Sequence, residues 1–201
     1  MRTPGALRPV EVWRYRGLAH AASEEASRWL SHFLQRAVTL VACPDDMDRV
    51  ANPDWAPRPT PLGFADGYPI LLLSEASLAD LNARLREPVD MMRFRPNLVL
   101  RGCPAFEEDR WKTIRIGALM IDILKPCDRC SMVTVDPATA EFAREPLATL
   151  ATFRRSPTGV LFGQNCASRT PGLIEVGAEV EVIEERAPDE LPPNFRLTSE
   201  R

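Results

Sequence analysis

Long apolar runs are absent from this chain of 201 residues, and so are the features of a secreted or membrane-anchored protein. No apolar run approaches the roughly 20 residues that a membrane span requires. Residues 1–5 lack the apolar core of a secretory signal. These absences predict a cytoplasmic protein that does not enter a membrane.

Cysteine, histidine and net charge are also low. The five cysteines are an odd number and are not spaced like a secreted disulfide framework, which favours a reducing compartment. The two histidines, His20 and His32, have no metal-ligand spacing around them and are expected on a helix face or in a loop. A net charge of -3 gives no reason to expect nucleic acid or an anionic membrane as a partner.

Glycine is scarce relative to proline, with ten residues against nineteen. This ratio predicts many short elements joined by stiff turns rather than a helical bundle. The composition, 45% hydrophobic and 26% charged, is ordinary for a globular protein. A chain of this length buries roughly 70% of its unfolded surface, which is enough for a sizeable core.

Hydrophobic periodicity predicts a β-rich α/β (α+β) domain over residues 11–186 and not a regular βαβ array. Residues 1–10 are expected to be disordered, and 187–201 to form a tail. Five prolines make 44–63 a long surface loop. Ser23 and Ser74 are suitable N-caps for two of the helices. The predicted helices are 24–37, 75–85 and 146–153, and the predicted strands are 11–15, 38–42, 70–73, 97–100, 113–116, 119–124, 160–163 and 179–183.

The pattern with the most chemical meaning is Cys127-Asp128-Arg129-Cys130. A structural zinc site needs four ligands, and only one cysteine pair is present. A thioredoxin-like redox pair normally opens a helix, whereas residues 131–135 are rich in β-branched types and are predicted to be extended. Spacing alone favours two inert cysteines in a turn. A single thiolate bound to a cofactor's soft metal is the remaining alternative.

Matches outside the pair point to a family. In order along the chain they are ILLLSEASL at 70–78, FRPNLVLRGC at 94–103, FEEDRW at 106–111, IG at 116–117, CDRC at 127–130, TVDP at 134–137 and LFGQ at 161–164. This series resembles the MOSC family, named for the C-terminal domain of molybdenum cofactor sulfurase. It is most similar to the branch that contains the mitochondrial amidoxime-reducing component and its bacterial relatives. The similarity runs from about residue 64 to 183, and more weakly back to residue 11.

The resemblance implies a β-rich MOSC-type barrel with a few peripheral helices, and a molybdenum–pyranopterin cofactor. It makes Cys130 the protein ligand of the metal and the catalytic residue. Asp128 stands where the animal proteins have serine, and a backbone contact is expected at Asn165. At the family level it also implies pyridoxal phosphate binding, with no residue assigned. The cofactor-binding residues that it implies are Arg95, Asn97, Asp128, Arg129 and Asn165.

The implied activity, expected of the full-length form of the protein, is reduction of small N-hydroxylated compounds. Electrons would come from a separate donor of ferredoxin, flavodoxin or cytochrome type, because no cysteine cluster follows the matched region. The alternative is a sulfur-carrier or cofactor-binding module without its own catalysis. Family members carry a β-rich N-terminal region that contacts the cofactor's phosphate. We expect most of it to be missing here, and the cofactor therefore to be weakly held or absent.

The remaining cysteines and the large aromatic residues are expected to pack rather than react. Small buried cysteines behave as apolar side chains. The cysteines are Cys43, Cys103 and Cys166, and the aromatic residues, expected in the core or a pocket wall, are Phe94, Phe106 and Trp111.

Overall fold

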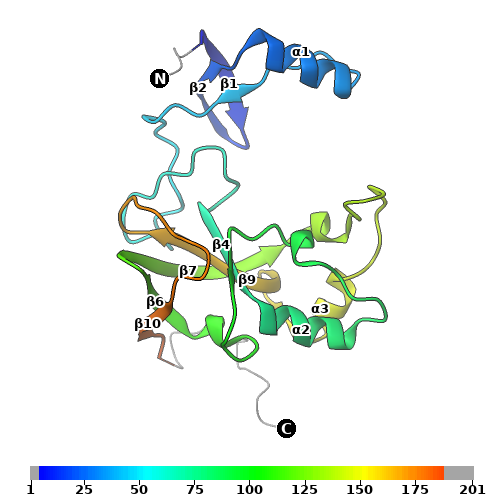
Figure 1. Cartoon of the computed structure of the whole chain (residues 1–201), viewed down its shortest axis with the longest axis vertical. Helices are drawn as coiled ribbons and strands as arrows, with labels where there is room; N and C mark the ends of the chain where they lie inside the picture. Colours follow the sequence, from blue (N-terminus) through cyan, green and yellow to red (C-terminus); the bar gives the residue numbers. More distant parts are fainter. Residues whose placement is uncertain (1–4, 188–201) are drawn as a thin grey trace. The chain divides into compact units, whose positions relative to one another are not determined.

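A computed structural model describes residues 5–187 of the chain. The backbone divides into two compact units, one up to Pro69 and one from Ile70 onward (Figure 1). The single domain expected over residues 11–186 is therefore divided, and the tail expected from 187 lies almost wholly outside the described residues. Each unit is described by itself below.

The first unit contains a three-stranded sheet in the order β1-β2-β3, built from Leu7–Val12, Tyr15–Ala21 and Val41–Ala42. The expected disorder of residues 1–10 is wrong from Leu7 onward. Strand β1 pairs with β2 along its whole length, from Leu7 opposite His20 to Val12 opposite Tyr15. Pro9 fits because β1 is an edge strand, where a missing N–H breaks no ladder.

Helix α1, Glu24–Phe33, follows this sheet and begins at the predicted cap. The Ser23 side chain accepts a hydrogen bond from the Ala26 N–H at 3.1 Å. The helix ends four residues earlier than predicted, because Gln35 adopts a left-handed conformation with φ of 49°. None of its residues is buried, and its Trp29 and Phe33 rings stack on the surface with centroids 5.7 Å apart.

The predicted loop at 44–63 is confirmed, since it contains only an isolated bridge between Val50 and Pro61. One buried side chain organises the end of this loop. Arg49 donates hydrogen bonds to the carbonyls of Gly63, Ala65 and Asp66. These bonds satisfy backbone acceptors that no sheet or helix pairs.

The second unit is built on a seven-stranded sheet. Its path is β10-β6-β7-β9-β4-β5, with β8 paired to β9, and only β4 and β5 run parallel. Within residues 5–187 no pairing joins the two ends of this path, so the sheet is a curled half-barrel rather than a closed one. The strands are β4 Ile70–Ser74, β5 Leu98–Leu100, β6 Trp111–Ile116, β7 Leu119–Arg129, β8 Arg155–Ser156, β9 Gly159–Ser168 and β10 Val180–Glu185.

Two helices pack beside one another against this sheet, α2 Glu75–Arg84 and α3 Leu147–Phe153 (Figure 1). Three short 3-10 helices complete the unit: η1 Met91–Arg93, η2 Glu107–Asp109 and η3 Ser131–Thr134. The prediction that residues 131–135 are extended is wrong. A 3-10 turn forms there because the Thr134 hydroxyl bonds back to the Ser131 carbonyl at 2.7 Å.

Both hydrophobic cores lie in the second unit, on opposite faces of the sheet. Leu72 belongs to one core and its neighbour Leu73 to the other, as expected of a strand whose successive side chains alternate. This explains why the sequence of β4 is a continuous apolar run. The first core contains Trp111, and the second contains Phe94 and Phe162, whose ring centroids are 4.5 Å apart. Trp111 and Phe94 are buried in the cores and Phe106 packs partly buried against the second, so the core positions predicted for these three residues are confirmed.

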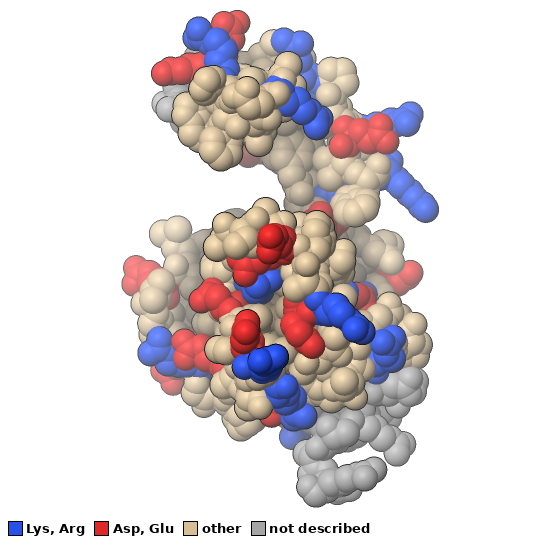
Figure 2. Space-filling model, turned by 90° about the vertical axis from the view of Figure 1, so that its right-hand side faces the viewer, with Lys and Arg blue, Asp and Glu red and all other residues tan. Residues whose placement is uncertain are grey.

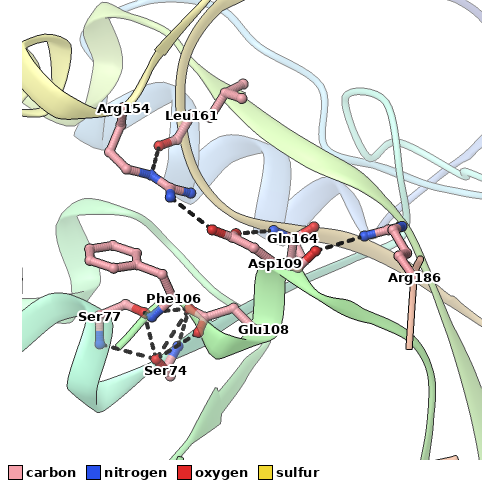
Figure 3. Close-up of polar contacts among 9 residues, drawn as sticks. All are labelled: Ser74, Ser77, Phe106, Glu108, Asp109, Arg154, Leu161, Gln164 and Arg186. Carbon is pink, nitrogen blue, oxygen red and sulfur yellow. Dashed lines mark hydrogen bonds and ion pairs between the residues drawn. The ribbon is translucent and has the colours of Figure 1, made fainter. Parts of the chain in front are cut away.

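A buried polar network ties the helices to the sheet (Figure 3). The Glu108 carboxylate accepts hydrogen bonds from the hydroxyls of Ser74 and Ser77 at the start of α2. The neighbouring Asp109 pairs with Arg154 at 2.8 Å and accepts from Gln164 at 2.6 Å. Burial raises the pKa of Asp109 to about 6, although the Arg154 cation opposes the shift.

The surface of the second unit is mixed in charge. On the described part of the face in Figure 2, basic and acidic side chains alternate rather than gather by sign. Among residues 5–187, no helix combines the length and apolar character needed to cross a bilayer.

Candidate functional site

Cys130 lies where strand β7 ends. The predicted strands 113–116 and 119–124 are confirmed as β6 and β7, which pair as an antiparallel hairpin, and β7 continues through Cys127 to Arg129. Cys130 then occupies the N-cap position of η3, with an extended backbone. Its side chain is exposed, whereas that of Cys127 is half-buried. The two cysteines thus differ in both environment and local structure.

Arg129 faces Cys127. Its Nη1 donates to the Cys127 sulfur at 3.1 Å, and its Nη2 donates to the Phe94 carbonyl at 2.8 Å. The guanidinium lies 5.4 Å from the centroid of the Phe94 ring. Its Nε is buried and has no partner. The cation that the sequence placed beside Cys130 is therefore bound to the other cysteine.

Asp128 is already paired. One carboxylate oxygen accepts from Lys125 at 2.8 Å, and the other accepts from the Thr158 hydroxyl at 2.8 Å. The Lys125 ammonium offsets the negative charge beside Cys130. An anionic ligand at this site would consequently meet a neutralised carboxylate rather than a free one.

Arg95 and Asn97 lie on the segment that leads into β5. Arg95 is exposed, and its side chain makes no hydrogen bond or ion pair with the described residues. Its backbone has φ of 54°, a left-handed conformation that is strained for a residue other than glycine. Asn97 is bound to β4 through two bonds of 2.8 Å, from its N–H to the Leu71 carbonyl and from the Leu71 N–H to its Oδ1. The side-chain nitrogen of Asn97, Nδ2, is left to donate to a ligand.

Asn165 lies in β9, between β4 and β7. Its backbone is opposite Leu71 on one side and Lys125 on the other, so both flanks are taken up by strand pairing. Its side-chain amide donates weakly to the Pro126 carbonyl at 3.4 Å. The backbone contact with a cofactor that is expected at Asn165 stays a prediction.

An ion pair that the sequence did not predict joins the segment around η1 to the turn that follows η3. Arg93 of η1 pairs with Asp136, which follows η3, at 2.8 Å. The other Asp136 oxygen accepts from the N–H groups of Ala138 and Thr139. These backbone hydrogen bonds hold the pKa of Asp136 below its usual value. The TVDP motif indicates the turn that contains Asp136. Nothing in the sequence indicates that Asp136 pairs with Arg93, which lies 43 residues earlier in the chain.

The balance of charge and of unmet hydrogen bonds suits an anionic ligand. Lys125 and Arg93 are paired with carboxylates, whereas Arg95 and Arg129 have no carboxylate partner among the described residues. Arg93 Nη1 and Arg129 Nε are buried donors without acceptors. Unmet buried donors are rare and commonly mark a missing partner. An exposed thiol that directly follows Arg129 in the chain fits an anionic group that carries a thiophilic metal.

Neither alternative use of the cysteine pair gains support from this geometry. Over residues 5–187 no group of three or more His, Cys, Asp or Glu side chains is placed to hold a metal ion, so the four ligands of a structural zinc site are not assembled there. A thioredoxin-like pair would open a helix with its first cysteine, but Cys127 lies within a strand.

The other three cysteines pack as predicted. Cys166 is fully buried in the first core, and burial strongly raises the pKa of its thiol. Cys103 is half-buried against the same core, and the pKa of its thiol is also raised by burial. Cys43 is half-buried in the first unit, where its sulfur lies 3.6 Å from that of Met47.

Known proteins match this chain over most of its length. The mitochondrial amidoxime-reducing component 1 of Danio rerio is 36% identical over 80% of this chain and 52% of its own length. The human component 1 is 41% identical over 61% of this chain and 39% of its own length. The molybdenum cofactor sulfurase of Oryza sativa is 35% identical over 77% of this chain and 21% of its own length. The chain spans about half the length of the first amidoxime-reducing components that it matches.

The family match covers residues 59–181 and bears the description "MOSC domain". Nothing in that description or in the names of the relatives supports pyridoxal phosphate binding. Both lysines of the sequence, Lys112 and Lys125, are engaged in ion pairs. The matched residues include every candidate site residue, together with the curled sheet except most of β10. The chain therefore belongs to the MOSC domain family.

Proposed function

We propose that this protein binds a molybdenum–pyranopterin cofactor through Cys130 and reduces small N-hydroxylated compounds. The names of the relatives point to amidoxime reduction and to the molybdenum cofactor. The observation that carries the proposal is the exposed Cys130 thiol at the end of β7, next in the chain to Arg129, whose buried Nε has no acceptor among the described residues. A free thiol and a guanidinium with an unmet donor suit an anionic ligand with a soft metal.

The residues of this chain have distinct tasks in that site. Cys130 would hold the metal as a thiolate ligand. Arg95, Arg129 and the Asn97 amide nitrogen donate to the anionic and polar groups of the cofactor. Asp128, neutralised by Lys125, presents an acceptor for ring N–H groups. The paired Arg93 and Asp136 keep the two loops at a fixed separation.

When bound, the cofactor would supply two-electron transfer coupled to removal of oxygen from nitrogen. Reduction of a hydroxylamine consumes two electrons and two protons and releases an amine and water. The electrons would come from a separate donor protein of ferredoxin, flavodoxin or cytochrome type. A reducing, cytoplasmic compartment would keep the exposed Cys130 thiol available.

Substitution of Cys130 tests this function. Cys130→Ala should lose molybdenum and at least 100-fold of the reductase activity on benzamidoxime with a chemical reductant, on the order of the loss seen when metal-site groups are removed. Cys103→Ala, a half-buried cysteine in the same unit, is the matched control and should keep both. Retention of molybdenum and activity by Cys130→Ala would reject the ligand role.

A sulfur-carrier module is the second candidate, favoured by the exposed position of Cys130. Its thiolate would take the terminal sulfur of a donor persulfide, and the donor would be released as a thiol. Intact-mass measurement after incubation with a persulfide donor distinguishes the two. A gain of one sulfur atom on Cys130, reversed by dithiothreitol, in protein without reductase activity would favour the carrier.

A further inference from the structure

Arg129 is held by two acceptors, and one of them is a sulfur. Its Nη1 donates to Cys127 Sγ at 3.1 Å and its Nη2 donates to the Phe94 carbonyl at 2.8 Å. Cys127 and Arg129 are two residues apart in β7, so both side chains project from the same face of the strand. The guanidinium is thus fixed at both outer nitrogens.

The two acceptors are themselves rigid. Phe94 is 1% exposed and packs against Phe162, which anchors the carbonyl in the second core. Cys127 lies at a register shift of β7, and the residues before and after it, Pro126 and Asp128, both pair with β9. A guanidinium held between a core-anchored carbonyl and a strand-anchored sulfur has little rotational freedom.

The third nitrogen of this guanidinium is unmet. Arg129 Nε is buried and has no acceptor among the described residues. A buried donor without a partner destabilises a fold. Rotation of the Arg129 side chain would ordinarily bring its Nε–H to an acceptor. The contact with Cys127 prevents that rotation, and it leaves Nε as the donor for an additional acceptor.

We propose that Cys127 is a positioning residue of the cofactor site, which aims the Arg129 guanidinium at an anionic group of the bound cofactor. This inference rests on the proposed function. Cys127 does not touch the metal in this account. The CDRC motif then contains one metal ligand, Cys130, and one residue that acts through Arg129.

Cys127 differs from the other four cysteines in its contact with an arginine side chain. Of the five, all within residues 5–187, only Cys127 accepts a hydrogen bond from an arginine side chain in the structure. Cys103 has similar exposure but packs against the first core, and Cys43 bonds to the Pro44 carbonyl. A packing role alone would be met equally well by an apolar side chain of similar volume at position 127.

The test uses the full chain and two readouts. The first is the rate at which phenylglyoxal modifies Arg129 in cofactor-free protein, followed by peptide mass spectrometry. The second is the affinity for molybdenum cofactor released anaerobically from a donor molybdoenzyme, followed by molybdenum and pterin content. The variants are Cys127→Ala, the volume-matched Cys127→Val, the acceptor-retaining Cys127→Ser and the control Cys103→Ala.

Loss of the sulfur acceptor should release Arg129. Cys127→Ala and Cys127→Val should speed its modification severalfold and weaken cofactor binding by about 10–100-fold, the range seen when a supporting partner of a metal site is removed. Cys127→Ser and Cys103→Ala should stay within about threefold of the unsubstituted protein, within the context-dependence of a retained hydrogen bond. Val in place of Cys127 tests the acceptor even if the smaller alanine disturbs folding.

The outcomes separate this inference from the proposed function. Unchanged modification of Arg129 in both Cys127→Ala and Cys127→Val, with unchanged cofactor affinity, would overturn the positioning role while the proposed function stands. Absence of cofactor binding by the unsubstituted chain, with Arg129 still released by both variants, would overturn the proposed function and leave the contact between Cys127 and Arg129 supported.

Discussion

The two units of this chain solve the problem of burying apolar side chains very differently. The second unit holds both hydrophobic cores, and it buries large side chains such as Phe94, Phe162 and Trp111 almost completely. The first unit contributes to neither core. Its buried hydrophobic residues within the described part are Ala19, Met47, Ala51, Ala56 and Leu62, while Trp29 and Phe33 are 64% and 71% exposed.

This difference shows where the candidate site obtains its rigidity. Every candidate site residue lies in the second unit, on strands or short turns anchored by a core. The first unit is organised instead by local hydrogen bonds, such as those of Arg49 to three backbone carbonyls. Sites held by packed elements are more precise than sites on loops. The predictions below test this contrast.

The largest expected effect is on the second core. Phe162→Ala should lower the free energy of unfolding of the second unit by about 3–5 kcal/mol, because a fully buried ring is replaced by a cavity. Phe33→Ala, which truncates an exposed ring of the first unit, should change stability by no more than about 0.5 kcal/mol. Urea denaturation followed by tryptophan fluorescence measures both. Equal losses in the two variants would remove the contrast.

A smaller effect is expected from the buried polar residue of each unit. Glu108→Ala should lower the stability of the second unit by about 1–3 kcal/mol, because the Ser74 and Ser77 hydroxyls lose their acceptor in the interior. Arg49→Ala should instead raise hydrogen exchange at residues 62–66 and leave protection in β7 and β9 unchanged. Hydrogen exchange with mass spectrometry measures both changes. Loss of protection in β9 on substitution of Arg49 would contradict the separation of the units.

The mildest effect depends on pH. The pKa of Asp109 is raised from 3.8 to about 6 in the folded protein, so the folded state holds a proton that the unfolded state has lost. The stability that this group contributes is full below pH 3.8 and declines as pH rises through about 6. Asp109→Asn should remove that decline. A stability difference between the two proteins that stays constant from pH 4 to 7 would contradict the raised pKa.

Local features of the fold were predictable from the sequence, and those that depend on distant partners were not. The hairpin of β6 and β7 followed from alternation, and the start of α2 from Ser74, which caps it. Strand β1 lacks a pattern of its own and is ordered by its pairing with β2. A single sequence shows no trace of such pairing unless the strand also has a buried face.

The candidate site also combines features that the sequence predicted with contacts that it did not. The motif singled out Cys130, and the structure adds that this cysteine is exposed and follows the end of β7. The contacts that set its electrostatics were not predictable. Arg129 reaches Phe94, 35 residues away, and turns toward Cys127, since strand geometry rather than adjacency decides which side chains meet.

The most direct test of the central claim is X-ray absorption at the molybdenum edge of the cofactor-loaded protein. The sulfur neighbours of the metal are compared between the unsubstituted chain and Cys130→Ser, with Cys127→Ser as the matched control. We predict that Cys130→Ser has one sulfur neighbour fewer and that Cys127→Ser has the same number as the unsubstituted chain. An identical sulfur shell in all three proteins would contradict the role of Cys130 as the metal's protein ligand.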